Sequence, residues 1–438
     1  MTLELFTDLY EVTMAQAYDS EGMDRTAIFE LAFRKMPDSR NYIVVNGLQD
    51  VMDFLTGFRL SPEDLDYLRG RKVSPAGFLK RLETLRFTGD VYAMPEGTLV
   101  FPGEPLVQVV APILEAQWME AFVLNQVHFQ SLAAAKAARV VQAAEGRAVV
   151  DFGSRRAHGI DAALKVARAT YLAGGQGTSN VLAAKLYGIP VFGTMAHSYI
   201  QAHDDEAAAL EAFACLYPET TLLVDTYDTL AGVRKVVELS RKLGRNFRVA
   251  GIRLDSGELA ALAVASRKML DDAGLKNVKI FASSGLDEYK IRSLVLSGAP
   301  IDAFGVGTKL AVMEDAPDLD MAYKLVEYGG KGRLKLSASK VLYPGRKQVF
   351  RQYESGRMSR DVIGRFDEEF SGEPLLRPLI RHGEPAACVD LNESRRRLRE
   401  QLAQAPETLL SLRQAAPYPV AISDRLESDF RDVCQRIR

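Results

Sequence analysis

Apolar and polar positions alternate in blocks between residues 148 and 308. Short apolar runs each end in glycine and polar residues, at intervals close to the roughly 30 residues of a strand–helix–strand unit. The endings stand at Gly153, Gly193, Asp225, Asp255, Ser284 and Gly307. The run at residues 170–173, followed by the glycine-rich segment 174–180, adds a further strand and brings the expected count to about seven. The alternation predicts an α/β barrel.

The two flanks of this region follow other patterns. Residues 8–20 show helical spacing, residues 27–33 alternate as strands do, and residues 89–110 combine β-prone residues with turns. Three parts of the chain are therefore expected. They are an α+β domain over residues 1–112 that is completed by strands from 323–352, a barrel domain over 113–322, and a mainly helical C-terminal extension over 353–438.

The composition narrows the class of protein. The 438 residues are 47% hydrophobic and 26% charged, which is ordinary for a globular protein. A net charge of −2 gives no support for a nucleic-acid or anionic-membrane partner. The three cysteines lie far apart, and neither a secretory leader nor a long apolar stretch is visible. We therefore expect a cytoplasmic enzyme that binds neither membranes nor nucleic acid.

The strand ends carry the candidate chemistry, because a barrel gathers its active-site residues there. Arg155 and Arg156 directly follow the first strand, and guanidinium groups bind carboxylate or phosphate with paired hydrogen bonds. A structural ion pair at a helix start would explain these arginines equally well. His197 could act as an acid–base group or as a nucleophile toward phosphorus, although a lone histidine is more often structural.

Acidic and glycine-rich strand ends extend this list. Asp225 and Asp255 suit Mg²⁺ or the hydroxyls of a sugar, while a helix-capping role is the alternative for Asp255. The turns 283–285 and 305–308 present backbone N–H groups of the kind that bind phosphate. The residues alone therefore predict an enzyme for a phosphorylated sugar and leave its reaction open.

Several of these segments together resemble the nicotinate phosphoribosyltransferase family. The resemblance rests on Thr7–Met14, Phe152–Ala157, Gly193–Ser198, Arg253–Gly257 and the segment from Lys335 to Gln348. It implies an incomplete α/β barrel with an α/β N-terminal domain. It also implies that nicotinate and phosphoribosyl pyrophosphate form nicotinate mononucleotide and pyrophosphate in NAD salvage. ATP hydrolysis would be coupled through a phosphohistidine, and His197 matches that position.

The resemblance and the residue chemistry together give a set of expected roles. The resemblance places Tyr10, Thr194 and Arg253 at nicotinate, and Arg155 and Ser179 suit its carboxylate. The catalytic candidates are His197, Arg253 and Asp255. For phosphoribosyl pyrophosphate the candidates are Arg156, Asp225, Asp255, Ser284, Gly285, Gly305, Gly307 and Thr308. Mg²⁺ and ATP are the expected cofactor and co-substrate, with Asp225 or Asp255 as metal ligands. The family's members imply a homodimer in which the tyrosine at position 10 reaches the neighbour's site.

Rival functions differ at single positions. The nicotinamide-using relatives typically have Gly-Thr-Asp where this chain has Gly177-Thr178-Ser179, and a serine there favours an acid substrate because it can donate to a carboxylate. The quinolinate-using relatives would need more basic residues. A Schiff-base aldolase on a barrel would use Lys309. A metabolite-binding protein without catalysis would not need His197.

Overall fold

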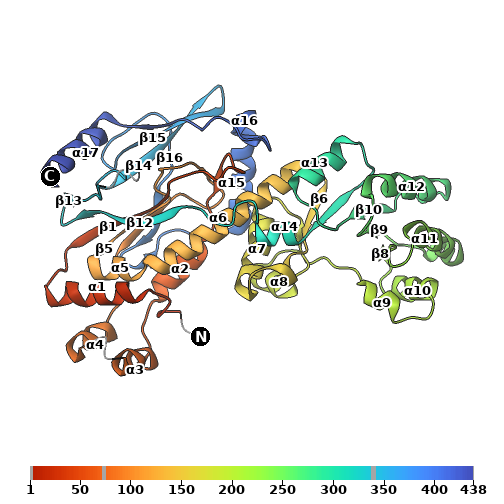
Figure 1. Cartoon of the computed structure of the whole chain (residues 1–438), viewed down its shortest axis with the longest axis horizontal. Helices are drawn as coiled ribbons and strands as arrows, with labels where there is room; N and C mark the ends of the chain where they lie inside the picture. Colours follow the sequence, from red (N-terminus) through yellow and green to blue (C-terminus); the bar gives the residue numbers. More distant parts are fainter. Residues whose placement is uncertain (1–2, 72–74, 337–341, 438) are drawn as a thin grey trace. The chain divides into compact units, whose positions relative to one another are not determined.

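The computed structural model describes residues 3–71, 75–336 and 342–437, and it contains two compact units (Figure 1). One unit combines residues Met1–Ala135 with Ala316–Arg438, and the other is Lys136–Asp315. Among the described residues, no helix is both long and apolar enough to cross a membrane.

The unit Lys136–Asp315 is built on a parallel sheet of six strands. The strands are β6 (Ala148–Asp151), β7 (Gly177–Thr178), β8 (Thr221–Leu223), β9 (Gly251–Leu254), β10 (Lys279–Ala282) and β11 (Ala303–Val306). Their order in the sheet is β7-β6-β11-β10-β9-β8. Neighbouring strands in this order follow one another along the chain, as in a barrel, except that β11 lies beside β6. The strands β7 and β8 do not pair, so they form the two edges of the sheet. The sheet is therefore a parallel half-barrel.

Helices alternate with these strands along the chain, and α10, α11 and α12 lie along the outer side of β8, β9 and β10 (Figure 1). The longer helices are α7 (Ile160–Leu172), α10 (Glu206–Leu216), α11 (Thr229–Leu243), α12 (Leu259–Asp272) and α13 (Glu288–Leu296). The short ones are α8 (Val181–Tyr187), α9 (His197–Gln201), α14 (Thr308–Val312), η1 (Ser154–Arg156) and η2 (Gly244–Asn246). In α11, Val233, Val236 and Val237 are buried, as the apolar spacing of that segment predicts.

The expected count of seven strands is not confirmed. The run that ends at Gly193 forms one isolated bridge, between Val191 and Thr178, and is not a strand of the sheet. The apolar run 170–173 is not a strand, because Thr170 and Leu172 lie in the buried last turn of α7. The strand near it is β7, which falls inside the segment expected to be a loop. A short buried apolar run cannot be assigned to helix or strand from its periodicity alone, which explains this error.

The other unit contains a seven-stranded antiparallel sheet in the order β13-β12-β1-β5-β3-β17-β18. These strands are β13 (Lys331–Gly332), β12 (Met321–Tyr328), β1 (Thr26–Phe33), β5 (Val107–Pro112), β3 (Asp90–Ala93), β17 (Arg377–Arg381) and β18 (Glu384–Pro385). Antiparallel pairing of β1 with β12 joins residues far apart in the sequence, with Glu30 opposite Lys324. A second sheet has the order β16 (Glu373–Pro374), β14 (Lys347–Glu354), β15 (Arg357–Arg365) and β19 (Val420–Ile422), and β2 (Ile43–Val44) pairs with β4 (Leu99–Val100).

The helices of this unit lie in its N-terminal and C-terminal parts. They are α1 (Leu9–Ser20), α2 (Leu48–Gly57), α3 (Pro62–Gly70), α4 (Ala76–Glu83), α5 (Ile113–Trp118), α6 (Glu120–Ala143), α15 (Leu391–Gln404), α16 (Glu407–Leu410) and α17 (Asp424–Ile437). The helix α6 continues past Ala135 into the other unit. The helix predicted over residues 8–20 is therefore present as α1, with Val12 and Ala15 buried.

The region from residue 353 onward differs from the mainly helical extension that was expected. It combines the helices α15, α16 and α17 with strands, of which the longest is β15. The reason is that β15 pairs along its whole length with β14, which places Asp361 opposite Arg351. Arg351 Nη2 and Asp361 Oδ2 lie 2.6 Å apart, and both side chains are 0% exposed. A helical segment could not bring these two side chains together in this register.

Candidate active site

Six of the predicted site residues line one cavity of about 300 Å³ at the carboxyl ends of the half-barrel strands. The predicted residues in its wall are Arg155, Ser179, Thr194, His197, Arg253 and Asp255. Each comes from a different strand end except Arg253 and Asp255, which belong to the end of β9, and Thr194 and His197, which share the segment before α9. The half-barrel therefore brings these side chains together, as the positions of the strand ends predict.

Arg253, Asp255 and Ser283 form a hydrogen-bonded cluster in the cavity wall. Arg253 Nε donates to Ser283 Oγ and Arg253 Nη2 donates to Asp255 Oδ1, each over 2.9 Å. The Ser283 hydroxyl also donates to Asp255 Oδ1. Burial alone would raise the pKa of Asp255, but the bond from Ser283 and the charge of Arg253 outweigh it and hold that pKa below its ordinary value. Asp255 is therefore a carboxylate at neutral pH.

His197 begins α9 and faces this carboxylate. Its Nε2 lies 3.6 Å from Asp255 Oδ2, and its Nδ1 lies 3.1 Å from Thr226 Oγ1. The side chain is 41% exposed, so a ligand in the cavity can reach the ring. A histidine with one nitrogen near a carboxylate and the ring open to a cavity suits proton transfer or attack on phosphorus.

Asp225 lies beneath the cluster and fixes the loop after β9. Its Oδ2 accepts from the backbone N–H of Asp255 over 2.8 Å and from Ser256 Oγ over 2.6 Å. Its other oxygen, Oδ1, is buried and has no hydrogen-bond partner in the described structure. A buried carboxylate oxygen without a donor suits a cation or a substrate hydroxyl, because leaving it unpaired is costly.

No cage of protein ligands for a metal exists in the described residues, since they contain no group of three or more histidine, cysteine or acidic side chains that could hold an ion. Mg²⁺ does not need such a cage, because it is commonly bound by one or two carboxylates together with substrate phosphates and water. Asp225 and Asp255 fit that smaller protein contribution.

Gly305 allows two aromatic rings to close the floor of the site. A Cβ atom at this position would lie 2.7 Å from Phe152 and 2.8 Å from the Phe281 ring. The rings of Phe152 and Phe281 stack at 5.6 Å, and the guanidinium carbon of Arg253 lies 5.2 Å from the Phe152 ring centre. Gly305 therefore acts through close packing that holds the ring beneath Arg253, and a side chain there would displace it.

The predicted phosphate turns stand outside the wall of this cavity. Ser284 and Gly285 follow β10 and both have positive φ, 88° and 55°. Gly307 precedes α14, which begins at Thr308. Arg156 is exposed in η1 and is likewise not in the cavity wall. A serine held at positive φ is strained, and strain of this kind concentrates at functional sites.

Sequence reasoning gave no side-chain role to three residues that organise the site. Ser283 joins Arg253 to Asp255, Thr226 contacts His197, and Phe152 underlies Arg253. Each stands at or just beyond the end of a strand, so its position was a usable signal. Asp151 was also left without a role; it is buried, accepts from Thr178 Oγ1 and from the N–H of Gly153 over 2.7 Å each, and so ties together the loops after β6 and β7.

Lys309, the lysine of the aldolase alternative, does not line the cavity and pairs with Glu314. A Schiff-base lysine needs access to a carbonyl substrate, so this placement counts against that alternative.

Tyr10 lies in the other unit, on α1, where its side chain is 46% exposed. Leu3, Phe6 and Leu9 beside it are also exposed large hydrophobic side chains. Burial and the nearby carboxylates of Glu120 and Glu11 raise the pKa of Tyr10 above its ordinary value, so the phenol keeps its proton.

A second cavity in the same unit is lined by basic residues that sequence reasoning missed. Arg34, Lys324, Arg333 and Lys335 line a cavity of about 290 Å³, and no acidic side chain is among the described residues of its wall. Arg34 is held by Asp320 at 3.2 Å. Arg34 is distant in sequence from the other three cations, and the pairing of β1 with β12 brings it to the strand that carries Lys324. Such a cavity suits a highly charged anion.

Comparison with known proteins identifies the family. Residues 5–128 match the nicotinate phosphoribosyltransferase (NAPRTase) N-terminal domain, and residues 147–334 match the nicotinate phosphoribosyltransferase (NAPRTase) family. A nicotinate phosphoribosyltransferase of Mycobacterium tuberculosis, pncB2, is 58% identical over 429 residues, which cover 97% of this chain and 93% of that protein. One of Bacillus subtilis is 42% identical over 386 residues, which cover 86% and 79%.

A solved structure agrees with these relatives. The crystal structure of human nicotinic acid phosphoribosyltransferase has a TM-score of 0.88 and 30% sequence identity, and the match covers 98% of this chain and 100% of that one. The half-barrel, the cavity at its strand ends and the matches over both units agree. The chain belongs to the nicotinate phosphoribosyltransferase family.

Proposed function

We propose that this enzyme transfers the phosphoribosyl group of phosphoribosyl pyrophosphate to nicotinate, forming nicotinate mononucleotide and pyrophosphate for NAD salvage. The observation that carries the proposal is the single cavity in which Arg155, Ser179, Thr194, Arg253 and the His197–Asp255 pair meet. Such a wall offers donors for a planar carboxylate next to a carboxylate–histidine pair. The membership of the family gives the reaction class.

Nicotinate binds as an anion in this proposal. Arg253 is oriented by Ser283 and Asp255, and Arg155 stands exposed after β6 in the same cavity wall, so both guanidinium groups are available for the nicotinate carboxylate. The uncharged Ser179 does not repel that carboxylate, which favours nicotinate over nicotinamide. Tyr10 supplies a ring to stack on the pyridine.

Phosphoribosyl pyrophosphate has phosphate at two ends, and the enzyme has two kinds of anion site. The N–H groups of the turns at Ser284–Gly285 and Gly305–Thr308 suit the 5′-phosphate, together with Arg156. The basic cavity of Arg34, Lys324, Arg333 and Lys335 suits the pyrophosphate. Asp225 and Asp255 hold the ribose hydroxyls or Mg²⁺, which would neutralise the departing pyrophosphate.

ATP serves as co-substrate in this proposal, and His197 is the residue that accepts its phosphoryl group. The support is the placement of the ring: Nε2 opens on the cavity beside Asp255, and Nδ1 is oriented by Thr226. Phosphorylation would add roughly two negative charges next to Asp255, which is enough to rearrange the loops at this end of the sheet.

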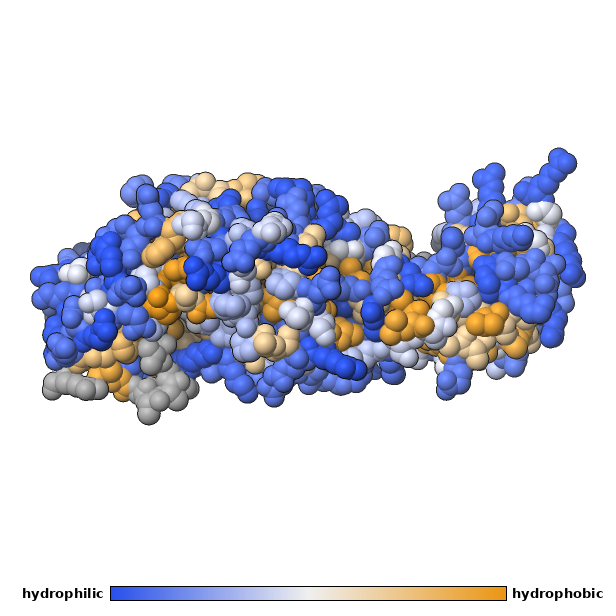
Figure 2. Space-filling model, turned by 90° about the horizontal axis from the view of Figure 1, so that it is seen from above, coloured by the Kyte–Doolittle hydropathy of each residue, from blue (hydrophilic) through white to orange (hydrophobic). Residues whose placement is uncertain are grey.

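A homodimer completes the proposal, with Tyr10 contributed to the partner's cavity. Each unit carries exposed apolar side chains that a second copy would cover. On the half-barrel these are Ile160, Val181, Leu182, Leu186, Val191 and Phe192, and on α1 they are Leu3, Phe6, Leu9 and Tyr10. Figure 2 shows apolar patches on an otherwise mostly hydrophilic face, and exposed patches often mark interaction sites. The proposed compartment is the cytoplasm, since Cys215, Cys388 and Cys434 are free thiols.

Pyrophosphate release tests this function directly. The purified enzyme is assayed with phosphoribosyl pyrophosphate and Mg²⁺, with nicotinate or nicotinamide, and with or without ATP. We expect release with nicotinate, acceleration by ATP, and little release with nicotinamide. Release that is as fast with nicotinamide would contradict the assignment of Ser179 and the two arginines.

A further inference from the structure

Arg333 and Gly345, which stand on the two sides of the undescribed residues 337–341, are both bonded to one carbonyl group of the sheet. The backbone N–H of Arg333 and the N–H of Gly345 each donate to the oxygen of Val326 over 2.8 Å. Val326 is buried in β12, so the oxygen that accepts these two hydrogen bonds is held in a fixed position. We call this point, formed by Gly332–Arg333 and Tyr343–Gly345, the base, because the described residues next to it are placed by the contacts that hold it.

Residues near this base supply two of the four cations that line the basic cavity. Arg333 and Lys335, together with Leu342, line the cavity that Arg34 and Lys324 complete. Arg34 and Lys324 are positioned by β1 and β12, whereas Arg333 and Lys335 stand beyond the strand β13. The positions of these last two cations consequently depend on the contacts at the base.

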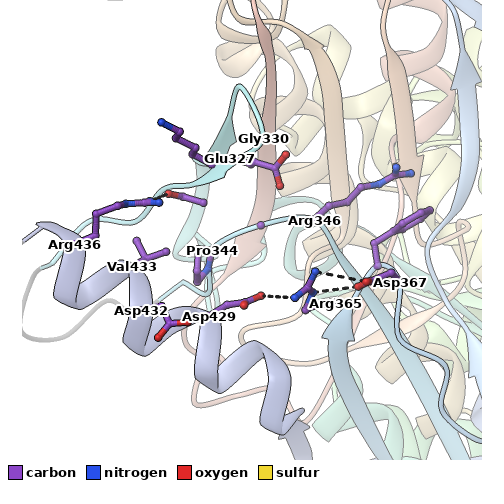
Figure 3. Close-up of a pocket in the computed structure, with 14 residues that line it drawn as sticks. Glu327, Gly330, Pro344, Arg346, Arg365, Asp367, Asp429, Asp432, Val433 and Arg436 are labelled. Carbon is purple, nitrogen blue, oxygen red and sulfur yellow. Dashed lines mark hydrogen bonds and ion pairs between the residues drawn. The ribbon is translucent and has the colours of Figure 1, made fainter.

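The C-terminal helix α17, on which Figure 3 labels Val433 and Arg436, contacts one side of the base at Gly332. A Cβ atom on Gly332 would lie 3.0 Å from Pro344 and 3.2 Å from Val433, so this glycine fits between the returning segment and the helix. Arg436 Nη2 donates to the Gly332 carbonyl oxygen. Gly332 directly precedes Arg333, so these contacts fix the backbone that carries the cation.

The same helix contacts the other side of the base at Tyr343. The Tyr343 hydroxyl donates to Glu427, and its ring lies 5.3 Å from that of Phe430. Burial and the bond to Glu427 raise the pKa of Tyr343 to about 12, so the hydroxyl remains a donor at neutral pH. The backbone of Tyr343 is also held, because Lys347 Nζ donates to its carbonyl oxygen over 2.6 Å.

The sequence of α17 suits this contact. Leu426 and Val433 are buried, and Phe430 lies between them at the spacing of one helix face. A cavity of about 440 Å³ separates parts of α17 from the base, and the pair of Arg365 with Asp429 at 3.5 Å spans it (Figure 3). The helix thus contacts the base through a few side chains and not along its whole length.

We propose that α17 is a positioning element for the phosphate-bearing substrate, and that Arg436, Val433, Glu427 and Phe430 act by holding the base that places Arg333 and Lys335. The inference rests on the proposed function, because it takes the basic cavity as the site of the pyrophosphate. None of these α17 residues lines the basic cavity, so their effect on substrate is indirect.

Two arginines of the same helix give a matched test. Arg436→Ala removes the donor to Gly332, while Arg431→Ala removes the same charge from an exposed position of α17. Calorimetry measures the Kd of phosphoribosyl pyrophosphate without turnover. We expect Arg436→Ala combined with Tyr343→Phe to raise this Kd about 5- to 10-fold, as the loss of hydrogen bonds predicts. Arg431→Ala should leave the Kd of phosphoribosyl pyrophosphate unchanged. The Kd of nicotinate should stay unchanged in every variant.

A double-mutant cycle distinguishes positioning from general loss of structure. If α17 acts through Lys335, then the substitutions in α17 add little to the effect of Lys335→Ala. Arg436→Lys keeps a donor and should recover much of the affinity. Equal Kd values for Arg436→Ala and Arg431→Ala, or full additivity with Lys335→Ala, would overturn the inference. Failure of the proposed function shows separately, as a parent enzyme that binds this substrate but releases no pyrophosphate with nicotinate.

Discussion

Two arginine–aspartate pairs, one in each unit, differ in what surrounds them. Arg351 and Asp361 are fully buried, and the guanidinium group also donates to Gln401 and to the carbonyl of Leu99, each over 2.8 Å. Arg253 and Asp255 are 13% and 25% exposed and stand in the wall of a cavity. The first pair is sealed among protein partners, whereas the second is open to a ligand.

This difference separates two uses of the same chemistry. A sealed pair cannot exchange partners, so it fixes the register of β14 against β15 and contributes to the folded state. An open pair keeps its charges oriented but accessible, so a substrate can share them. We therefore expect damage to the sealed pair to appear in unfolding measurements and damage to the open site to appear in activity.

The largest expected effect is that of Arg351→Met. It leaves the carboxylate of Asp361 buried without its cation, beside Glu104, whose pKa burial already raises well above its usual range. The unfolding free energy should fall by about 3–5 kcal/mol, measured by urea denaturation. The control is Arg360→Met, because Arg360 donates to Gln352 at the surface. A similar fall in both variants would remove the distinction between sealed and exposed arginines.

The next effect is that of His197→Ala on ATP-coupled turnover. Without an acceptor for the phosphoryl group, the ATP-dependent rate of pyrophosphate release should fall at least about 100-fold, while nicotinate still binds. The unfolding free energy should change by less than about 0.5 kcal/mol, because the ring is half-exposed. His382→Ala, which alters an exposed histidine of the other unit, is the control. A variant that responds to ATP as fully as the parent would refute the role of His197.

Arg253→Ala is expected to separate the two substrates. Loss of a charged donor should raise the KM for nicotinate about 10- to 100-fold and affect phosphoribosyl pyrophosphate much less. Steady-state kinetics with each substrate varied in turn measure this split. Equal weakening of both substrates would mean that Arg253 mainly holds Asp255, to which it donates, and does not read the carboxylate.

The smallest effect concerns Glu11, a buried acid that has no cation paired with it among the described residues. Burial raises the pKa of Glu11 to about 7, while the bond from Thr7 opposes this and the charges of Glu120 and Asp8 add to it. Since the unfolded carboxyl titrates near pH 4.3, the folded state holds an extra proton between about pH 4.5 and 7. The unfolding free energy should therefore fall by about 1–3 kcal/mol as the pH rises through that window.

The check is Glu11→Gln, which cannot ionise and should flatten this slope. Urea unfolding at several pH values measures the slope, and Glu21→Gln at the exposed end of α1 serves as control. An unchanged slope in the Glu11→Gln enzyme would assign the pH dependence to other groups.

The sequence predicts the half-barrel well where strands are buried and end in glycine or polar residues, as at β6, β8, β9, β10 and β11. It fails at residues 170–173, where burial within α7 gives the same apolar run as a strand. The meeting of Arg253 with His197 followed from their positions at strand ends. The bonds that Asp225 accepts from the loop after β9 did not follow, because they join two loops whose geometry no periodicity encodes. The basic cavity was also out of reach, since it depends on the register of β1 against β12.

The open half-barrel has a consequence for aggregation. A sheet that does not close leaves unpaired N–H and C=O groups on two edge strands, and such edges can recruit strands from other molecules. Here the edges are β7 with Gly177–Thr178 and β8 with Thr221–Leu223, the two shortest strands of the sheet, and the backbone of Thr178 is already bonded to Pro190 and Phe192. An intruding strand would find too few backbone partners to remain bound. The half-barrel can therefore stay open in a concentrated protein solution without promoting aggregation through its edge strands.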